Sequence, residues 1–193
     1  MTELLESLRA LALRDRLEES RPLLLKETRS SSTCGPVRVD GSADHVALRL
    51  GDRDFLPLLN PEAKVRKLPD YLIFADPPAS ARRRHRHLAL QVVICELKSG
   101  AAGAEAATAQ LRCGRLLARY LIGLAALRIA QGEPADSDDI IKFCGVVVVP
   151  QALLRKGVTR PEVMPNRQHD TLSQMPVHRV GDGGIVELDT FIL

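Results

Sequence analysis

The sequence predicts an α/β domain in which a mixed central β-sheet is flanked by helices. Two runs, 88–98 and 140–150, are rich in aliphatic and β-branched residues, which is the pattern of strands buried on both faces. Between them, residues 104–130 carry the longest helical pattern of the chain. Buried strands that are separated by a long helix indicate an α/β architecture.

The size and composition of the chain fit one domain with an aliphatic core. The chain has 193 residues, of which 45% are hydrophobic, 26% are charged and only 3% are aromatic. So few aromatic rings exclude base stacking or sugar stacking as the main mode of binding. No internal repeat or linker divides the sequence, so we predict a single domain over 1–193 in which 151–193 is a peripheral C-terminal extension.

The N-terminal part alternates between helical and strand patterns. Residues 2–20 place leucines at helical spacing, with Thr2 as a candidate N-cap, and predict an amphipathic helix that ends before Pro22. Residues 22–27 fit either a strand or a helix. Residues 37–52 alternate on both sides of an Asp-Gly pair, which predicts a hairpin.

The later elements are bounded by turn residues. A short strand over 70–76 is stopped by two prolines, and a basic loop leads from it into the strand at 88–98. The helix over 104–130 is closed by Gly132 and Pro134. Near the C-terminus, residues 183–193 are a candidate edge strand. The predicted order is therefore helix, two or three strands, long helix, strand.

The cysteines and the apolar segments predict a cytoplasmic protein that does not cross a membrane. The four cysteines form no CxxC pair, and the acidic N-terminus contains no apolar segment of the secretory type. The longest apolar stretch, 121–130, is interrupted by Arg128 and is too short to span a bilayer. We therefore expect reduced thiols and no zinc site.

Two charges near the end of the 88–98 strand are the strongest indication of function. Side chains alternate across a strand, so Glu96 and Lys98 share one face, and burial of both is costly without partners. Asp70 begins the preceding strand and would approach Glu96 if the two strands pair. Two carboxylates and a main-chain carbonyl suit Mg²⁺ or Mn²⁺, and a nearby lysine could orient an attacking water.

The motif Pro69-Asp70 followed by Glu96-Leu97-Lys98 resembles the PD-(D/E)xK nuclease superfamily. The resemblance implies a restriction-endonuclease-like αβββαβ core. It implies that Asp70 and Glu96 bind the metal, that the Leu97 carbonyl is a further ligand, and that Lys98 is the catalytic lysine. Gln110 resembles the polar residue that many members carry on the helix after the lysine strand.

Two features of the family are open or absent in this sequence. Many members add a glutamate from the first helix, and Glu18, Glu19 and Glu27 are equal candidates for that role. The Gln-x-x-x-Tyr variant of the exonuclease branch is absent, because position 114 is glycine.

The resemblance predicts a Mg²⁺- or Mn²⁺-dependent nuclease that hydrolyses phosphodiester bonds of nucleic acid. DNA is the expected substrate, a role in defence or repair would suit the family, and a homodimer would suit the cutting of two strands. The competing hypothesis is a non-enzymatic nucleic-acid- or protein-binding module, such as an inhibitor or immunity protein, on the same fold. In that case Glu96 and Lys98 form only a cross-strand salt bridge.

Two basic segments are candidates for contact with a phosphate backbone. The loop 82–87 reads RRRHRH, and Arg112, Arg115 and Arg119 form one stripe on the predicted long helix. For the loop, a solvated connection is an equal alternative, and for the stripe a solvated helix face is the default interpretation.

Overall fold

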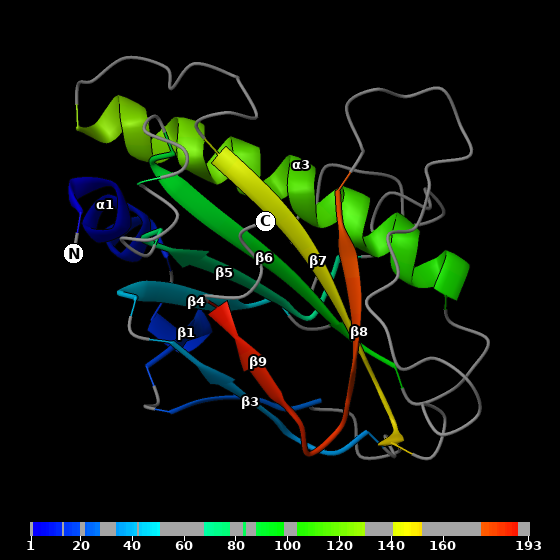
Figure 1. Cartoon of the computed structure of the whole chain (residues 1–193). Coiled ribbons are helices and arrows are strands. Elements are labelled where there is room, and N and C mark those ends of the chain that lie inside the picture. The colour runs from blue at the N-terminus through cyan, green and yellow to red at the C-terminus, as the bar shows by residue number, and fades with distance from the viewer. Residues whose placement is uncertain are drawn as a thin grey trace.

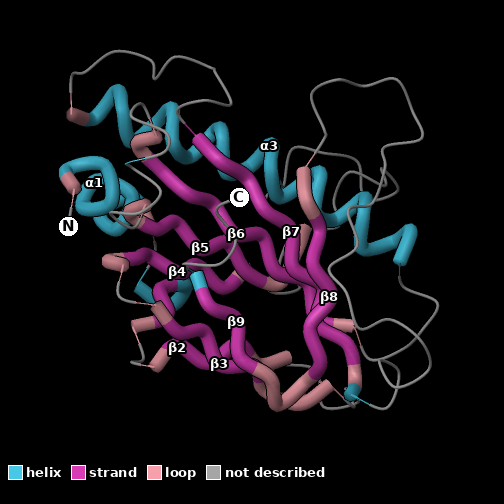
Figure 2. The backbone as a smooth tube through the Cα atoms, in the orientation of Figure 1, coloured by secondary structure: helices cyan, strands magenta, loops and turns pink. Residues whose placement is uncertain are grey.

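The structure is a computed structural model. The chain forms two β-sheets, and its helices lie on one side of them (Figures 1 and 2). The structure describes residues 2–12, 14–19, 22–27, 34–41, 43–50, 68–77, 83, 88–98, 104–129, 141–151 and 175–188. The elements are α1 (Glu3–Leu11), the 3-10 turn η1 (Arg14–Arg16), β1 (Leu17–Glu18), β2 (Leu23–Leu25), β3 (Val37–Asp40), β4 (His45–Arg49), β5 (Tyr71–Ala75), β6 (Leu90–Leu97), α3 (Ala104–Arg128), β7 (Ile141–Val149), β8 (Val177–Gly181) and β9 (Ile185–Glu187).

The larger sheet has six strands in the order β1-β4-β5-β6-β7-β8. Strands β4, β5 and β6 are antiparallel neighbours, whereas β7 runs parallel to β6 and β8 runs parallel to β7. Helix α3 connects β6 to β7, as a parallel pair requires. The predicted α/β class with a mixed sheet and flanking helices is confirmed, and the three long elements 88–98, 104–130 and 140–150 are all present.

The helices α1 and α3 cover one face of the six-stranded sheet, as Figure 1 shows. Alternate side chains of β5 and β6, such as Phe74 and Ile94, pack there against Leu5 of α1 and Leu111 of α3. We call this cluster the helix-side core. The Ser7 hydroxyl on α1 donates to the main-chain carbonyl of Ala125 on α3 at 3.1 Å and ties the two helices together.

The three-stranded sheet, in the order β2-β3-β9, covers the opposite face. Val37 and Val39 of β3 pack there against Tyr71 and Cys95, whose side chains alternate with those of the helix-side core. The Tyr71 hydroxyl also donates to the carbonyl of Lys26 at 2.8 Å and accepts from its N–H at 3.0 Å. The start of β5 is thereby joined to the second sheet.

The first helix is shorter than predicted. It ends at Leu11, and Ala12 is already extended, so the helix expected over 2–20 is wrong beyond its first half. Leu17 fitted the spacing of a longer helix. It lies instead in β1, where it pairs with Leu48 of β4. Thr2 takes the N-cap position without a side-chain cap, because its hydroxyl donates to Asp76 at 3.0 Å.

The predicted hairpin over 37–52 is also wrong. Strand β3 pairs with β2 and β9, whereas β4 pairs with β1 and β5, so the two strands belong to different sheets. Gly41 has a φ of 153°, in the region that favours glycine, at the point where the chain leaves β3. The alternation indicated two strands, but not which strands are their partners.

The remaining segments take strand structure at the edges of the two sheets. The ambiguous stretch 22–27 contains β2, and the C-terminal edge strand predicted within 183–193 is β9. Strand β8 at the edge of the larger sheet was not predicted. Neither α1 nor α3, the two α-helices in the described ranges, has the length and apolar character that a membrane crossing requires.

Candidate functional site

The predicted site residues meet at one end of the β5–β6 pair. Tyr71 pairs with Cys95, so Asp70 and Glu96 occupy the next opposed positions in the same register. The neighbouring residues on that side, Leu72 and Ile94, belong to the helix-side core. The two carboxylates therefore face the same side of the sheet, beneath α3, as the alternation of the strands predicted.

Glu96 is a buried carboxylate with one oxygen in an ion pair. Its side chain is 3% exposed, and its Oε1 lies 2.5 Å from the Lys98 ammonium. Its Oε2 is buried and has no hydrogen-bond partner among the described residues. A buried carboxylate oxygen without a partner is costly, so this atom is where a cation or a donor would be most strongly bound.

Lys98 and Gln110 form a chain of contacts from the strand to the helix. The Lys98 ammonium also donates to Gln110 Oε1 at 2.5 Å, and Gln110 Nε2 donates to the carbonyl of Leu68 at 3.1 Å. Gln110 thus holds the lysine from α3 and at the same time fixes the segment that leads into Asp70. The structure brings all four predicted side chains, Asp70, Glu96, Lys98 and Gln110, to one place.

Asp70 is fixed by the main chain around it. Its Oδ2 accepts a hydrogen bond of 2.7 Å from the N–H of Leu97, and its own carbonyl accepts one of 2.8 Å from the N–H of Leu50. The side chain therefore reaches across to the end of β6, next to the Leu97 main chain. That places the Asp70 carboxylate beside the backbone that follows Glu96, in one compact group.

The electrostatics of the group are those of two carboxylates in a dry environment. Burial first, and then the negative charge of Asp70, raise the pKa of Glu96 from 4.5 to about 7, while Lys98 and, to a smaller extent, Gln110 oppose the shift. Because burial makes the negative charge of these carboxylates energetically costly, a bound cation would stabilise the site strongly. Carboxylate oxygens, like those of Asp70 and Glu96, are ligands that Mg²⁺ and Mn²⁺ prefer.

Gly114 lets α3 approach the site closely, and sequence reasoning did not foresee this role. A Cβ atom at this position would lie 2.6 Å from Ile94 Cγ2 and 2.6 Å from Pro69 Cγ. A side chain at position 114 would therefore force Ile94 or the Pro69 ring to shift. An isolated glycine inside a predicted helix was the available signal.

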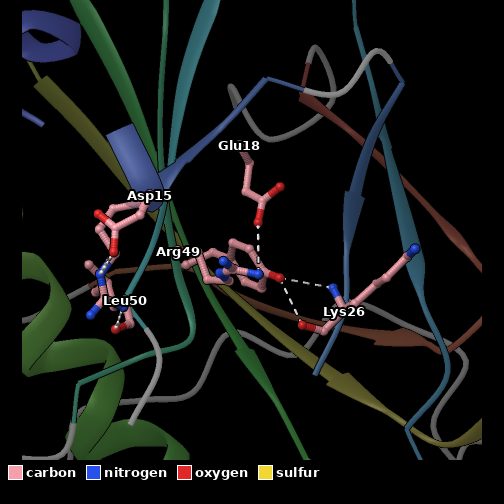
Figure 3. Close-up of polar contacts among 7 residues, drawn as sticks. Asp15, Glu18, Lys26, Arg49 and Leu50 are labelled. Atoms are coloured by element: carbon pink, nitrogen blue, oxygen red, sulfur yellow. Dashed lines mark hydrogen bonds and ion pairs between the residues drawn. The ribbon is translucent and has the colours of Figure 1, made fainter. Parts of the chain in front are cut away.

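Of the three upstream glutamates, two are directed away from the site. Glu18 pairs with Ala47 on the opposite face of the sheet and forms an ion pair of 3.4 Å with Arg49, as Figure 3 shows. Glu19 follows Glu18 along β1, in the direction away from Leu48 and therefore away from the end that carries Asp70. Neither has a geometric reason to join the carboxylates.

Glu27 lies at the edge of the site, together with two residues that the sequence did not indicate. Burial first, then the charges of Asp182, Glu27 and Asp70, raise the pKa of the Cys34 thiol to about 11, against a hydrogen bond with the Lys98 backbone. Asp182 accepts from the N–H of Gly35 at 2.9 Å. The residues that lead into β3 therefore border the strand ends.

The two basic segments have different outcomes. In the loop 82–87 only Arg83 belongs to the described residues, so the predicted phosphate contacts lie outside them. On α3, the guanidinium groups of Arg115 and Arg119 lie 4.9 and 5.5 Å from the centre of the Phe143 ring of β7. Arg115 is 5% exposed, so the interpretation as a solvated helix face is wrong for Arg115, whereas Arg112 and Arg119 are half-buried.

Within the described ranges, no group of three or more His, Cys, Asp and Glu side chains is placed to hold a metal ion. Comparison of the chain with protein-family models, with curated proteins and with solved structures gave no match.

Proposed function

We propose that the protein is a divalent-metal-dependent nuclease with a restriction-endonuclease-like core. With β1, β2 and β3 inserted between α1 and β4, the elements α1, β4, β5, β6, α3 and β7 occur in the αβββαβ order that such a core implies. The observation that carries the proposal is the Glu96 carboxylate, which is buried opposite Asp70 with one oxygen lacking a partner among the described residues. Neither an ordinary surface salt bridge nor a packed apolar strand end accounts for that oxygen.

Asp70, Glu96 and the Leu97 carbonyl would hold the metal, which when bound polarises a phosphoryl oxygen and activates water for attack. Lys98 is positioned by Glu96 and Gln110 and presents its ammonium at the same strand end. Its role is to orient the attacking water and to stabilise negative charge on the phosphate. Gln110 is a positioning residue that acts through Lys98.

The substrate that this arrangement favours is the phosphodiester backbone, with DNA proposed ahead of RNA. The chain contains only two tyrosines, four phenylalanines and no tryptophan, so few rings are available for base stacking. Recognition by cationic and main-chain contacts to phosphates is therefore expected to dominate over base readout.

The test is cleavage of supercoiled plasmid and of single-stranded DNA in the presence of Mg²⁺ or Mn²⁺. We expect Asp70→Asn, Glu96→Gln and Lys98→Ala each to lower the cleavage rate by about 10²-fold or more. Glu18→Gln is the matched control, because Glu18 is an acidic residue on the opposite face of the sheet. This variant should cut at the wild-type rate.

Two results would remove the proposal. Cleavage that persists in Asp70→Asn and Lys98→Ala would show that the activity resides elsewhere. A folded wild-type protein that cuts neither substrate with either metal, and shows no Mn²⁺ binding by calorimetry, would favour the non-enzymatic binding module on the same fold.

A further inference from the structure

Helix α3 carries exposed apolar side chains on the side that faces away from the sheet. Leu116, Tyr120 and Leu127 are 70, 61 and 60% exposed, more than any other large hydrophobic side chain in the described part of the chain. Figure 1 shows that α3 lies across the outside of the sheet. Large apolar groups that gather on one exposed helix face indicate an interaction surface.

The exposed residues belong to a regular pattern along the helix. Positions 109, 113, 116, 120, 123 and 127 are separated by alternating intervals of four and three residues, which is the spacing of a coiled-coil seam. None of these positions is buried, and none carries a charged residue. We call this set the outer seam: Ala109, Cys113, Leu116, Tyr120, Gly123 and Leu127.

The outer seam lies opposite the face that α3 packs on the sheet. Leu111, Ala118 and Ala125, spaced seven residues apart, are buried in the helix-side core. In a heptad these positions point directly away from the seam. The helix is therefore apolar on two opposite faces, and a helix of this kind is normally covered on both.

The seam is complementary to itself. Its intervals read the same in both directions, so two antiparallel copies align in register about a two-fold axis at the level of Ala118. Leu116 then faces Tyr120 of the second copy, Cys113 faces Gly123, and the small Ala109 faces the large Leu127. The antiparallel order also sets oppositely directed helix dipoles side by side.

We propose that α3 pairs with α3 of a second copy of this chain, antiparallel and through the outer seam. The interface is isologous, because the same patch is used on both subunits. The seam is about 27 Å long at the rise of an α-helix, which corresponds to a small interface. The dimer should therefore dissociate on dilution, with a Kd on the order of micromolar. The proposal does not depend on nuclease activity.

The first test is the mass of the protein in solution, measured by sedimentation velocity over a range of concentrations. We expect the wild type to shift from monomer to dimer as the concentration rises, and the double variant Leu116→Glu/Tyr120→Glu to stay monomeric. Ile185→Glu is the matched control, because Ile185 is 54% exposed on β9 and lies outside the seam. A wild type that remains monomeric, or a double variant that dimerises like the control, would overturn the proposal.

The second test is disulfide formation between copies, which reports the orientation of the helices. Nothing lies within 4 Å of a Cβ atom built at Gly123, so Gly123→Cys fits without strain. The introduced thiol would face Cys113 of the second copy. Within one helix, positions 113 and 123 are about 15 Å apart along the axis, so thiols there cannot bond to each other.

Mild oxidation should therefore convert Gly123→Cys to a covalent dimer, and the additional change Cys113→Ser should abolish that product. In the wild type, the two Cys113 thiols of an antiparallel dimer are also about 15 Å apart along the axis. A wild-type covalent dimer that disappears in Cys113→Ser would show a parallel pair and would overturn the antiparallel arrangement.

Discussion

The inner and outer sides of α3 both carry apolar side chains, but under very different constraints. On the inner side, a Cβ atom at Gly114 would collide with Ile94 and Pro69, whereas on the outer side a Cβ atom at Gly123 would meet nothing within 4 Å. The inner side also supplies Gln110 to the candidate site. Hydrophobicity alone does not distinguish the two sides. What distinguishes them is how closely other atoms surround each position.

The largest contrast is expected from one leucine on each side of the helix. Leu111→Ala removes a fully buried side chain from the helix-side core and should lower the free energy of unfolding by about 2–5 kcal/mol. Leu116→Ala removes a mainly exposed side chain and should change it by less than about 0.5 kcal/mol. Urea denaturation at low protein concentration measures both values. Equal losses would mean that the outer side is as well packed as the inner side.

A second contrast concerns Glu96, the carboxylate that the inner side of α3 covers. Because the pKa of Glu96 is about 7 in the fold and 4.5 ordinarily, the folded protein binds more protons than the unfolded chain between these values. The free energy of unfolding of the metal-free protein should therefore fall as the pH rises from about 4.5 to 7, and stay level above that range. The total change is about 3 kcal/mol.

Glu96→Gln should lack this component, since its side chain does not titrate. The measurement is the pH profile of stability in EDTA for wild type and Glu96→Gln. If the stability of the wild type and of Glu96→Gln changed in parallel between pH 4.5 and 7, Glu96 would not be a buried carboxylate with a raised pKa.

The smallest contrast is between the two glycines themselves. Alanine is favoured over glycine in a helix by about 1 kcal/mol, so Gly123→Ala should raise the free energy of unfolding by up to that amount. At Gly114 the added methyl group must displace Ile94 and the Pro69 ring, and we expect a net loss of about 1–3 kcal/mol. Thermal unfolding of the two variants decides the sign. A stabilised Gly114→Ala would show that α3 can move away from β6.

The strand end that carries the site could be predicted because strand alternation is strict. The apolar runs identified β5 and β6, and the period of two placed Asp70 and Glu96 on the same face of their strands. Gln110 was singled out only through resemblance to a family, and its contact with Lys98 was not predicted, since no local pattern relates a strand residue to a helix residue. The position of Glu27 near Cys34 depends on how the second sheet packs, which the sequence pattern does not report.

The errors share one cause, which is that periodicity describes faces and not partners. Strand β3 alternates between buried and exposed residues, whereas β4 is buried on both faces, and the two strands pair in different sheets. Leu17 fitted the helical spacing of the first segment, but in the structure it pairs with Leu48 in the larger sheet. The spacing of Arg115 and Arg119 indicated a solvated helix face, but their guanidinium groups lie over the Phe143 ring.

The two sheets are interleaved along the chain. Along the chain, β1 belongs to the larger sheet, and β2 and β3 belong to the smaller one. The strands from β4 to β8 belong again to the larger sheet, and β9 belongs to the smaller one. No single cut of the chain can separate them, and neither sheet could have been acquired or exchanged as one contiguous insertion. The hydrogen bond from Gly35 to Asp182, between residues 147 positions apart, joins the segment before β3 to the turn between β8 and β9. Recombination with another protein would therefore have to keep the strands from β1 to β9 together to preserve both layers.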